Sequence, residues 1–244
     1  MLRALALLLV LTACSAAPAG QVAPADPVAL LDGWRQGTGR QKSVRFDVRI
    51  EVVGKIPRKQ SYTGVLHSSW MGGTLQEDVT AHYESRDGTT DSRSVSVDHD
   101  RYLRHSDLTL PPGKEFSSMG LNDALWVGPL TTELTLASRE YRPGSLFTKI
   151  DRKTVRLTGR DGDRYVFEAG GVPHSGSYAN GDVRLVVEVD DEDRVVRVEQ
   201  TTPTVDGQTE HLTAVYSQWG TAPDVPRPPA QTVAHPKEVK VDDR

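Results

Sequence analysis

Apolar and polar residues alternate with a period of two along much of the chain, most clearly at residues 44–52. Every second residue in this segment is apolar, and every residue between is charged. Successive side chains of a strand point to opposite faces of a sheet. The segment is therefore predicted to be a strand with one buried face and one face in water.

Similar alternation recurs later in the chain. Residues 75–83 alternate except at Glu77, and Asp-Gly pairs at 87–88, 161–162 and 206–207 predict tight type I′ hairpin turns. The other strand-like runs are 155–160, 165–168, 183–189, 196–198 and 212–216. Together they predict an antiparallel meander of about nine to eleven strands in sequence order.

A helix is predicted to precede the strands. Asp26 suits the N-cap and Pro27 the first helical position, and Gly37 and Gly39 would end the helix. Its apolar face would carry Leu30, Leu31 and Trp34. The fold class is therefore mainly β with short helices (α+β).

Residues 108–150 break the alternation. Asn122 is a candidate cap for one short helix, and Ser145 for another that would include Leu146, Phe147 and Ile150. This segment is expected to cross the apolar face of the sheet as short helices and a loop.

Residues 1–14 have the pattern of an export signal. Arg3 supplies a positive charge, and residues 4–11 are apolar but too few to span a bilayer. Leu11-Thr12-Ala13-Cys14 resembles the bacterial lipobox. The resemblance implies cleavage before Cys14 and attachment of a diacylglyceryl group to its thiol. The alternative is an ordinary secretory signal that is cleaved near the alanines at positions 17 and 19.

The expected domain organisation follows from this signal. It comprises a signal peptide (1–13), the acylated cysteine with an Ala- and Pro-rich tether (14–26), one domain (27–226) and a Pro-rich, charged C-terminal tail (227–244). The expected location is the cell membrane, on its outer, extracytoplasmic face, with the lipid as anchor. Because Cys14 is the only cysteine, the chain cannot form an internal disulfide.

The charge distribution limits the partners. The formal net charge is −4, and no stripe of Lys and Arg occurs, so nucleic acid is excluded as a partner. The acidic balance also argues against binding anionic lipid headgroups through a polybasic patch. We expect a monomer that contacts the membrane through its acyl anchor.

No catalytic motif is present, so the chain is predicted not to be an enzyme and to need no cofactor. His174-Ser175-Gly176-Ser177 is interpreted as a polar surface loop rather than a nucleophile site. The pair His99 and His105 lacks the spacing of a metal site. The acidic run 190–193 lacks the spacing of a calcium loop and is interpreted as a hairpin.

Three passages of the chain resemble LolA-like bacterial lipoproteins, specifically the actinobacterial LppX/LprG type. They are Trp34-Arg35 with 43–47, residues 187–190 with 193–198, and residues 216–220 with the prolines at 226, 228 and 229. The resemblance covers nearly the whole mature chain, but residues 116–141 depart from the Ala- and Leu-rich helical stretch expected there. It implies a half-barrel, in which a strongly curved antiparallel sheet wraps around the N-terminal helix and the short inserted helices.

The resemblance also implies an apolar cavity that holds or transports acylated lipids or glycolipids. A carrier must replace roughly 13 kcal/mol when a sixteen-carbon chain leaves a bilayer, so such a cavity would have to be large and dry. The candidate lining residues are Phe46, Val48, Ile50, Trp70, Val79, Ala81, Tyr83, Leu125, Trp126, Leu146 and Phe147.

The same residues also fit a closed core. In that alternative the protein is an anchored interaction or sensor module of the cell envelope, which binds a protein partner and has no lipid ligand. The sequence does not decide between the two, because the predicted inner face carries the bulky Phe46, Ile50 and Tyr83 as well as the small Ala81.

Overall fold

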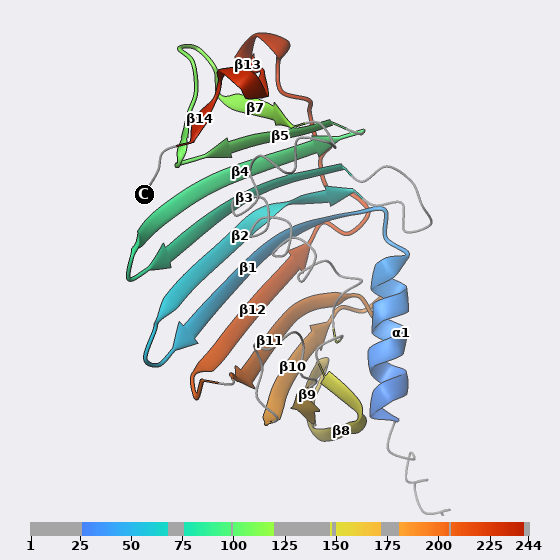
Figure 1. Ribbon diagram of the computed structural model, residues 1–244. Helices are drawn as coiled ribbons and strands as arrows, with labels where there is room; N and C mark the ends of the chain where they lie inside the picture. The colour runs from blue at the N-terminus through green and yellow to red at the C-terminus, as the bar shows by residue number, and fades with distance from the viewer. Residues whose placement is uncertain are drawn as a thin grey trace, which may run out of the picture.

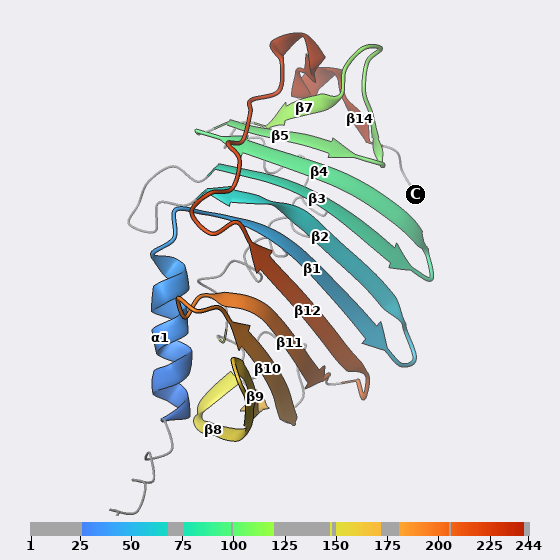
Figure 2. The same ribbon diagram turned by 180° about the vertical axis from the view of Figure 1, so that it is seen from behind.

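The computed structural model describes residues 26–67, 76–98, 100–119, 147, 150–171, 181–204 and 206–241. These residues form one large, open, curved sheet with helix α1 (Pro27–Gly39) beside it (Figures 1 and 2). Neighbouring strands of the sheet are antiparallel, except for one short parallel pair at its edge. The predicted fold class is confirmed.

Twelve strands within the described residues make up the large sheet. In order across the sheet they are β13 (Val233–Ala234), β7 (Phe116–Met119), β5 (Asp100–His105), β4 (Gly88–Val97), β3 (Gln76–Ser85), β2 (Arg58–His67), β1 (Ser43–Val53), β12 (Thr209–Ser217), β11 (Val195–Pro203), β10 (Asp182–Val189), β9 (Arg164–Gly171) and β8 (Ile150–Asp161). A second, two-stranded sheet pairs β6 (Leu108–Thr109) with β14 (Lys240–Val241), and two short 3-10 helices are η3 (Ala230–Thr232) and η4 (Pro236–Glu238).

The order of the strands differs from the predicted meander in sequence order, and that prediction is wrong. β1 lies between β2 and β12, because it pairs with β12 in register from Arg45 opposite Ser217 to Val53 opposite Thr209. This pairing joins two meanders into one sheet. Consequently β7 and β8, which follow each other in the chain, lie near opposite edges of the sheet.

The register aligns the apolar residues of neighbouring strands in rows. Val48 lies opposite Ala214 of β12 and Tyr62 of β2, and the same row continues through Val198 and Val187. These residues lie on the face of the sheet that α1 covers, which we call the inner face. The charged residues of β1 lie on the other face, which we call the outer face.

Helix α1 begins and ends as its sequence predicts. The side chain of Asp26 accepts a hydrogen bond from the amide of Val28 at 3.0 Å, and Pro27 occupies the first turn. Leu31 and Trp34 are buried on the inner face of the sheet. The short helix predicted after Ser145 is wrong where the structure describes it. Phe147 has a positive φ of 69°, which is not helical, and Ile150 begins β8. Asn122 and Ser145 lie outside the described residues.

The three predicted hairpins are present, but their turns are not of type I′. Gly88, Gly162 and Gly207 have positive φ angles, whereas the aspartates before them do not. A type I′ turn needs two successive residues with positive φ. Gly162 and Gly207 supply the left-handed residue of their turns, whereas Gly88 is the first residue of β4 and the turn before it, Arg86-Asp87, has no residue with positive φ.

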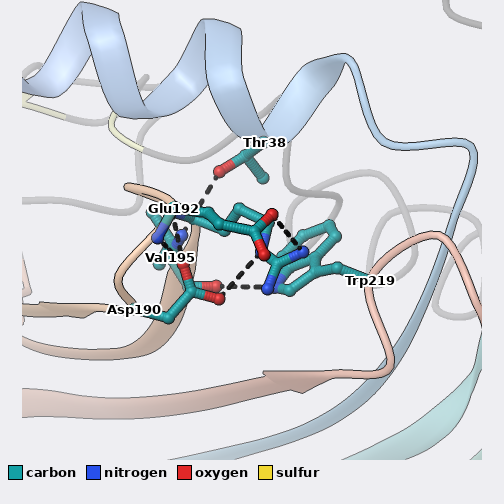
Figure 3. A network of polar contacts seen from close by, with 6 residues as sticks. Thr38, Asp190, Glu192, Val195 and Trp219 are labelled. Carbon is teal, nitrogen blue, oxygen red and sulfur yellow. Dashed lines mark hydrogen bonds and ion pairs between the residues drawn. The ribbon is translucent and has the colours of Figure 1, made fainter.

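The loop between β10 and β11 holds the C-terminal end of α1 against the sheet (Figure 3). The Val195 amide donates a hydrogen bond to the Thr38 hydroxyl at 3.4 Å, and the Trp219 indole donates to the Val195 carbonyl at 3.1 Å. Asp190 accepts hydrogen bonds from the amide and the guanidinium of Arg194 at 2.9 and 2.8 Å. The acidic run 190–193 is thus part of a hairpin loop, as the sequence predicts.

Asp190→Ala is expected to destabilise the protein by about 1–3 kcal/mol at neutral pH, because these charge-assisted hydrogen bonds are lost. Burial raises the pKa of Asp190, but hydrogen bonds from Arg194 and Glu192 outweigh it and hold the pKa below its usual value. A lowered folded-state pKa contributes stability above the unfolded value of about 3.9, and this stability is lost as the pH falls through the folded value. Urea unfolding should therefore give a difference from wild type that shrinks below about pH 4.

Asp191→Ala is the matched control. Asp191 is exposed in the same loop, and its replacement is expected to change the stability by less than about 0.5 kcal/mol. An equal loss of stability in the two variants would mean that any change in this loop destabilises the protein and that the Asp190 hydrogen bonds are not the cause.

The C-terminal segment packs on the sheet. Tyr216 stacks on Trp219, with ring centroids 5.7 Å apart, and the amide of Gly220 donates to the Ser43 carbonyl at 2.8 Å. Arg227 then pairs with Asp98 and Asp100 at the β4–β5 turn. Residues 227–241, assigned to the tail in the sequence analysis, include β13, which pairs with β7, and β14, which pairs with β6.

Candidate functional site

The inner face of the sheet carries most of the predicted cavity residues that the structure describes. Tyr83 lies on this face by register and is half-buried, and Phe147 is half-buried and packs against the inner-face cluster. The buried ones, which share one apolar cluster, are Phe46, Val48, Ile50, Val79 and Ala81. Cys14, Trp70, Leu125, Trp126 and Leu146 lie outside the described residues.

The apolar cluster extends further across the sheet than the sequence analysis assigned. Phe167 of β9 and Leu185 and Val187 of β10 are 0–1% exposed and belong to the same cluster. The alternation within 183–189 was a signal for a buried face. Only the register of β10 with β9 and β11 places that face in line with Val48.

Helix α1 covers one end of the inner face. It packs on β8 and β11, and Trp34 meets the rings of Tyr165 and Phe167 edge-on, at centroid distances of 4.7 and 6.0 Å. Such T-shaped contacts are favourable for aromatic rings. The part of the inner face on β1, β2 and β3 lies away from these α1 contacts (Figure 1).

A charged pair lies at the margin of the inner face. Glu77, which interrupts the alternation of residues 75–83, points to the same face as Val79 and is 2% exposed. Its carboxylate accepts hydrogen bonds from Arg101 at 3.4 Å and from Ser96 at 3.3 Å. Burial of a carboxylate is costly unless it is paired, and the register supplies the partner by aligning Glu77, Ser96 and Arg101.

The outer face carries a second apolar cluster and a polar groove. Val95, Val97, Tyr102 and Phe116 pack there against Val225 of the C-terminal segment. A groove of about 340 Å³ lies beside them, and Arg93 in its wall makes a bidentate pair with Asp78 at 2.9 and 2.8 Å. The groove is lined by Arg45, Phe46, Asp47, Thr63, Gly64, Val65, Asp78, Thr80, Arg93, Val215 and Ser217. Its charged walls do not suit an acyl chain.

Among the described residues, no group of three or more His, Cys, Asp and Glu side chains could hold a metal ion. His105 is buried, and its Nδ1 accepts a hydrogen bond from the Asp107 amide at 3.0 Å. Within the same part of the chain, no helix is long and apolar enough to cross a membrane.

Comparison with known proteins gives structural likenesses only. No protein-family model and no curated protein match the sequence. The crystal structure of LprF from Mycobacterium bovis matches with a TM-score of 0.49 and 14% identity, over 83% of this chain and 97% of that one. The Mycobacterium tuberculosis lipoprotein LppX matches with a TM-score of 0.46 and 12% identity, over 82% and 97%. A LolA superfamily protein from Nitrosomonas europaea matches with a TM-score of 0.30 and 14% identity, over 82% and 94%. These are proteins of the type that the sequence resembles, and at such identities the likeness concerns the fold and not the ligand.

Proposed function

We propose that this chain is an exported lipoprotein that binds an acylated lipid or glycolipid on the inner face of its half-barrel. An acyl group on Cys14 would anchor it to the outer face of the cell membrane. The role is binding or transport rather than catalysis. The observation that carries the proposal is the continuous apolar inner face, whose rows run from Val79 of β3 to Phe167 of β9.

The proposal includes a cover over this face. β7 ends at Met119 and β8 begins at Ile150, near opposite edges of the sheet. The segment between them contains Leu125, Trp126 and Leu146, which the sequence analysis assigned to the cavity. In the proposal this segment caps an acyl chain that lies on the inner face.

The polar margin supports an amphiphilic ligand. Arg101, which is paired with the buried Glu77, places a charged side chain beside the apolar cluster. A ligand with a polar head and an acyl tail matches a face that is apolar at its centre and charged at one margin. A pure hydrocarbon would gain nothing from the charged pair.

A closed core remains the second candidate, and one observation favours it. The chain's own atoms leave Val48 0% and Val79 3% exposed, as expected for side chains that pack against one another. In this case the protein would be an anchored interaction or sensor module that binds a protein partner of the envelope.

Ala81→Trp distinguishes the two candidates. Ala81 lies on the inner face between Tyr62 and Ser92 of the neighbouring strands. If a cavity is present, the indole fills it, so native mass spectrometry should find bound lipid in the wild type and little in the variant, with a nearly unchanged denaturation midpoint. If the core is closed, the added volume should cost about 1–3 kcal/mol.

Thr80→Trp is the matched control, because Thr80 is the preceding residue on the outer face and is exposed. It is expected to leave both the bound lipid and the stability close to wild type. A large loss of stability in Ala81→Trp, with no lipid in either protein, would contradict lipid binding and favour the interaction module.

A further inference from the structure

The tip of the β1–β2 hairpin, residues 53–59, exposes apolar side chains. Val53 is 50% exposed and Ile56 is 59% exposed. Apart from Val215 on the outer face, these are the large hydrophobic residues that the described part of the chain leaves exposed. Isolated exposed apolar residues are common, but here two of them share one tip with a cluster of cations.

The tip is basic although the whole chain has a net charge of −4. Lys55, Arg58 and Lys59 are exposed, and within the described residues their side chains make no ion pair. Lys59 lies opposite Glu51 and Glu84 in the register of the sheet. Arg58 lies opposite Val52 and Ser85, and Lys55 is in the turn, so neither of these two cations is aligned with a carboxylate in the register of the sheet.

Gln208 holds the tip in place from the neighbouring β11–β12 loop. The Ile56 amide donates a hydrogen bond to Gln208 Oε1 at 2.8 Å. Gly54 has a φ of +149°, and a Cβ there would lie 2.6 Å from Cγ of Gln208, so only glycine allows this close approach. The apolar and basic side chains are thus presented by an ordered backbone, which reduces the entropy lost on binding.

We propose that this tip binds the surface of an anionic lipid bilayer. Val53 and Ile56 enter the headgroup region, and Lys55, Arg58 and Lys59 lie beside the lipid phosphates. The net negative charge of the chain does not prevent this, because charges beyond a Debye length of about 8 Å are largely screened. The expectation from overall composition, that no polybasic contact forms, is thereby reversed for this one tip.

The tip and the proposed acyl anchor can contact the same membrane. The predicted tether, residues 14–26, can extend over about 40 Å at most. A single attachment through a tether leaves the domain free to rotate, whereas a second contact fixes its orientation. The proposal does not depend on a ligand at the inner face.

The test is co-sedimentation of the chain from residue 15 onwards, without any acyl group, with intact vesicles. This form keeps every described residue. Binding should be stronger to vesicles of phosphatidylcholine with phosphatidylglycerol than to phosphatidylcholine alone, and should weaken with salt. Removing the cations in a Lys55→Gln, Arg58→Gln, Lys59→Gln variant should weaken binding about fivefold per cation. A Val53→Ser, Ile56→Ser variant should also weaken binding, and circular dichroism should find both variants folded.

The matched control carries Arg35→Gln, Arg40→Gln and Lys42→Gln, three exposed cations at the opposite end of β1. It has the same net charge as the basic-tip variant and should bind like wild type. Equal binding to both vesicle types, unchanged binding of the tip variants or an equal loss in the control would each overturn the proposal. Native mass spectrometry of the tip variants reports on the inner face separately, so failure here is distinguishable from failure of the proposed lipid site.

Discussion

Replacing Cys14 with alanine is expected to remove the whole protein from the membrane fraction. Cys14 is the only thiol in the chain, so no other residue can carry the proposed thioether-linked diacylglyceryl group. A diacylglyceryl group supplies two chains, each worth about 0.8 kcal/mol per buried CH₂, whereas a single chain binds membranes only marginally. Fractionation of cells that express Cys14→Ala, with mass spectrometry of the N-terminus, measures both location and acylation.

The basic tip is proposed to bind anionic lipid without the acyl anchor, so the salt concentration must be controlled in this test. Fractions should be washed at about 1 M salt, where the Debye length is about 3 Å and an electrostatic contact through Lys55 and Arg58 is screened. Ser15→Ala keeps the thiol and is the control that should remain in the membrane. A Cys14→Ala protein that stays membrane-bound after the wash, with normal processing, would contradict the lipoprotein interpretation.

The strands that could be predicted are those with one buried and one wet face. Residues 44–52 were predicted from their alternation, and β1 extends over Ser43–Val53. β2 has no such pattern, since Gln60 and Gly64 share its inner face with Tyr62 and Leu66. Its presence follows only from pairing with β1 and β3, so no local signal could have placed it.

β4 could not be predicted from the alternation of apolar residues either, for a different physical reason. Its inner-face positions carry Ser92, Ser94 and Ser96, while its buried valines, Val95 and Val97, point to the outer face. These valines are buried because the C-terminal segment packs over them. A sequence pattern contains no information about this remote cover, so a tail was predicted where the structure has part of the fold.

The charged pair of the inner face shows the same limit of local patterns. Glu77 looked like an interruption of a strand, but it is the partner of Arg101, twenty-four residues away. The two meet because β3, β4 and β5 pair in a fixed register, which alternation does not specify. Candidate residues within one strand were therefore predictable, and contacts between strands were not.

The second large effect is expected for Trp34→Ala, which should lower the free energy of unfolding by about 3–5 kcal/mol. Trp34 is 3% exposed and contacts Tyr165 and Phe167 across the interface between α1 and the sheet. The substitution leaves a cavity at that interface and removes two edge-on aromatic contacts. Urea denaturation followed by circular dichroism should give a lower midpoint with an unchanged slope.

Gly33→Ala, at the preceding helical position, is the matched control. Gly33 is exposed, and no atom lies within 4 Å of where its Cβ would be. Alanine there is expected to stabilise the protein by about 0.5–1 kcal/mol, because glycine is costly inside a helix. If Trp34→Ala costs less than about 1 kcal/mol while Gly33→Ala behaves as expected, α1 forms without contributing to the core. The inner face would then be stabilised by the sheet alone, and α1 could leave it without unfolding the domain.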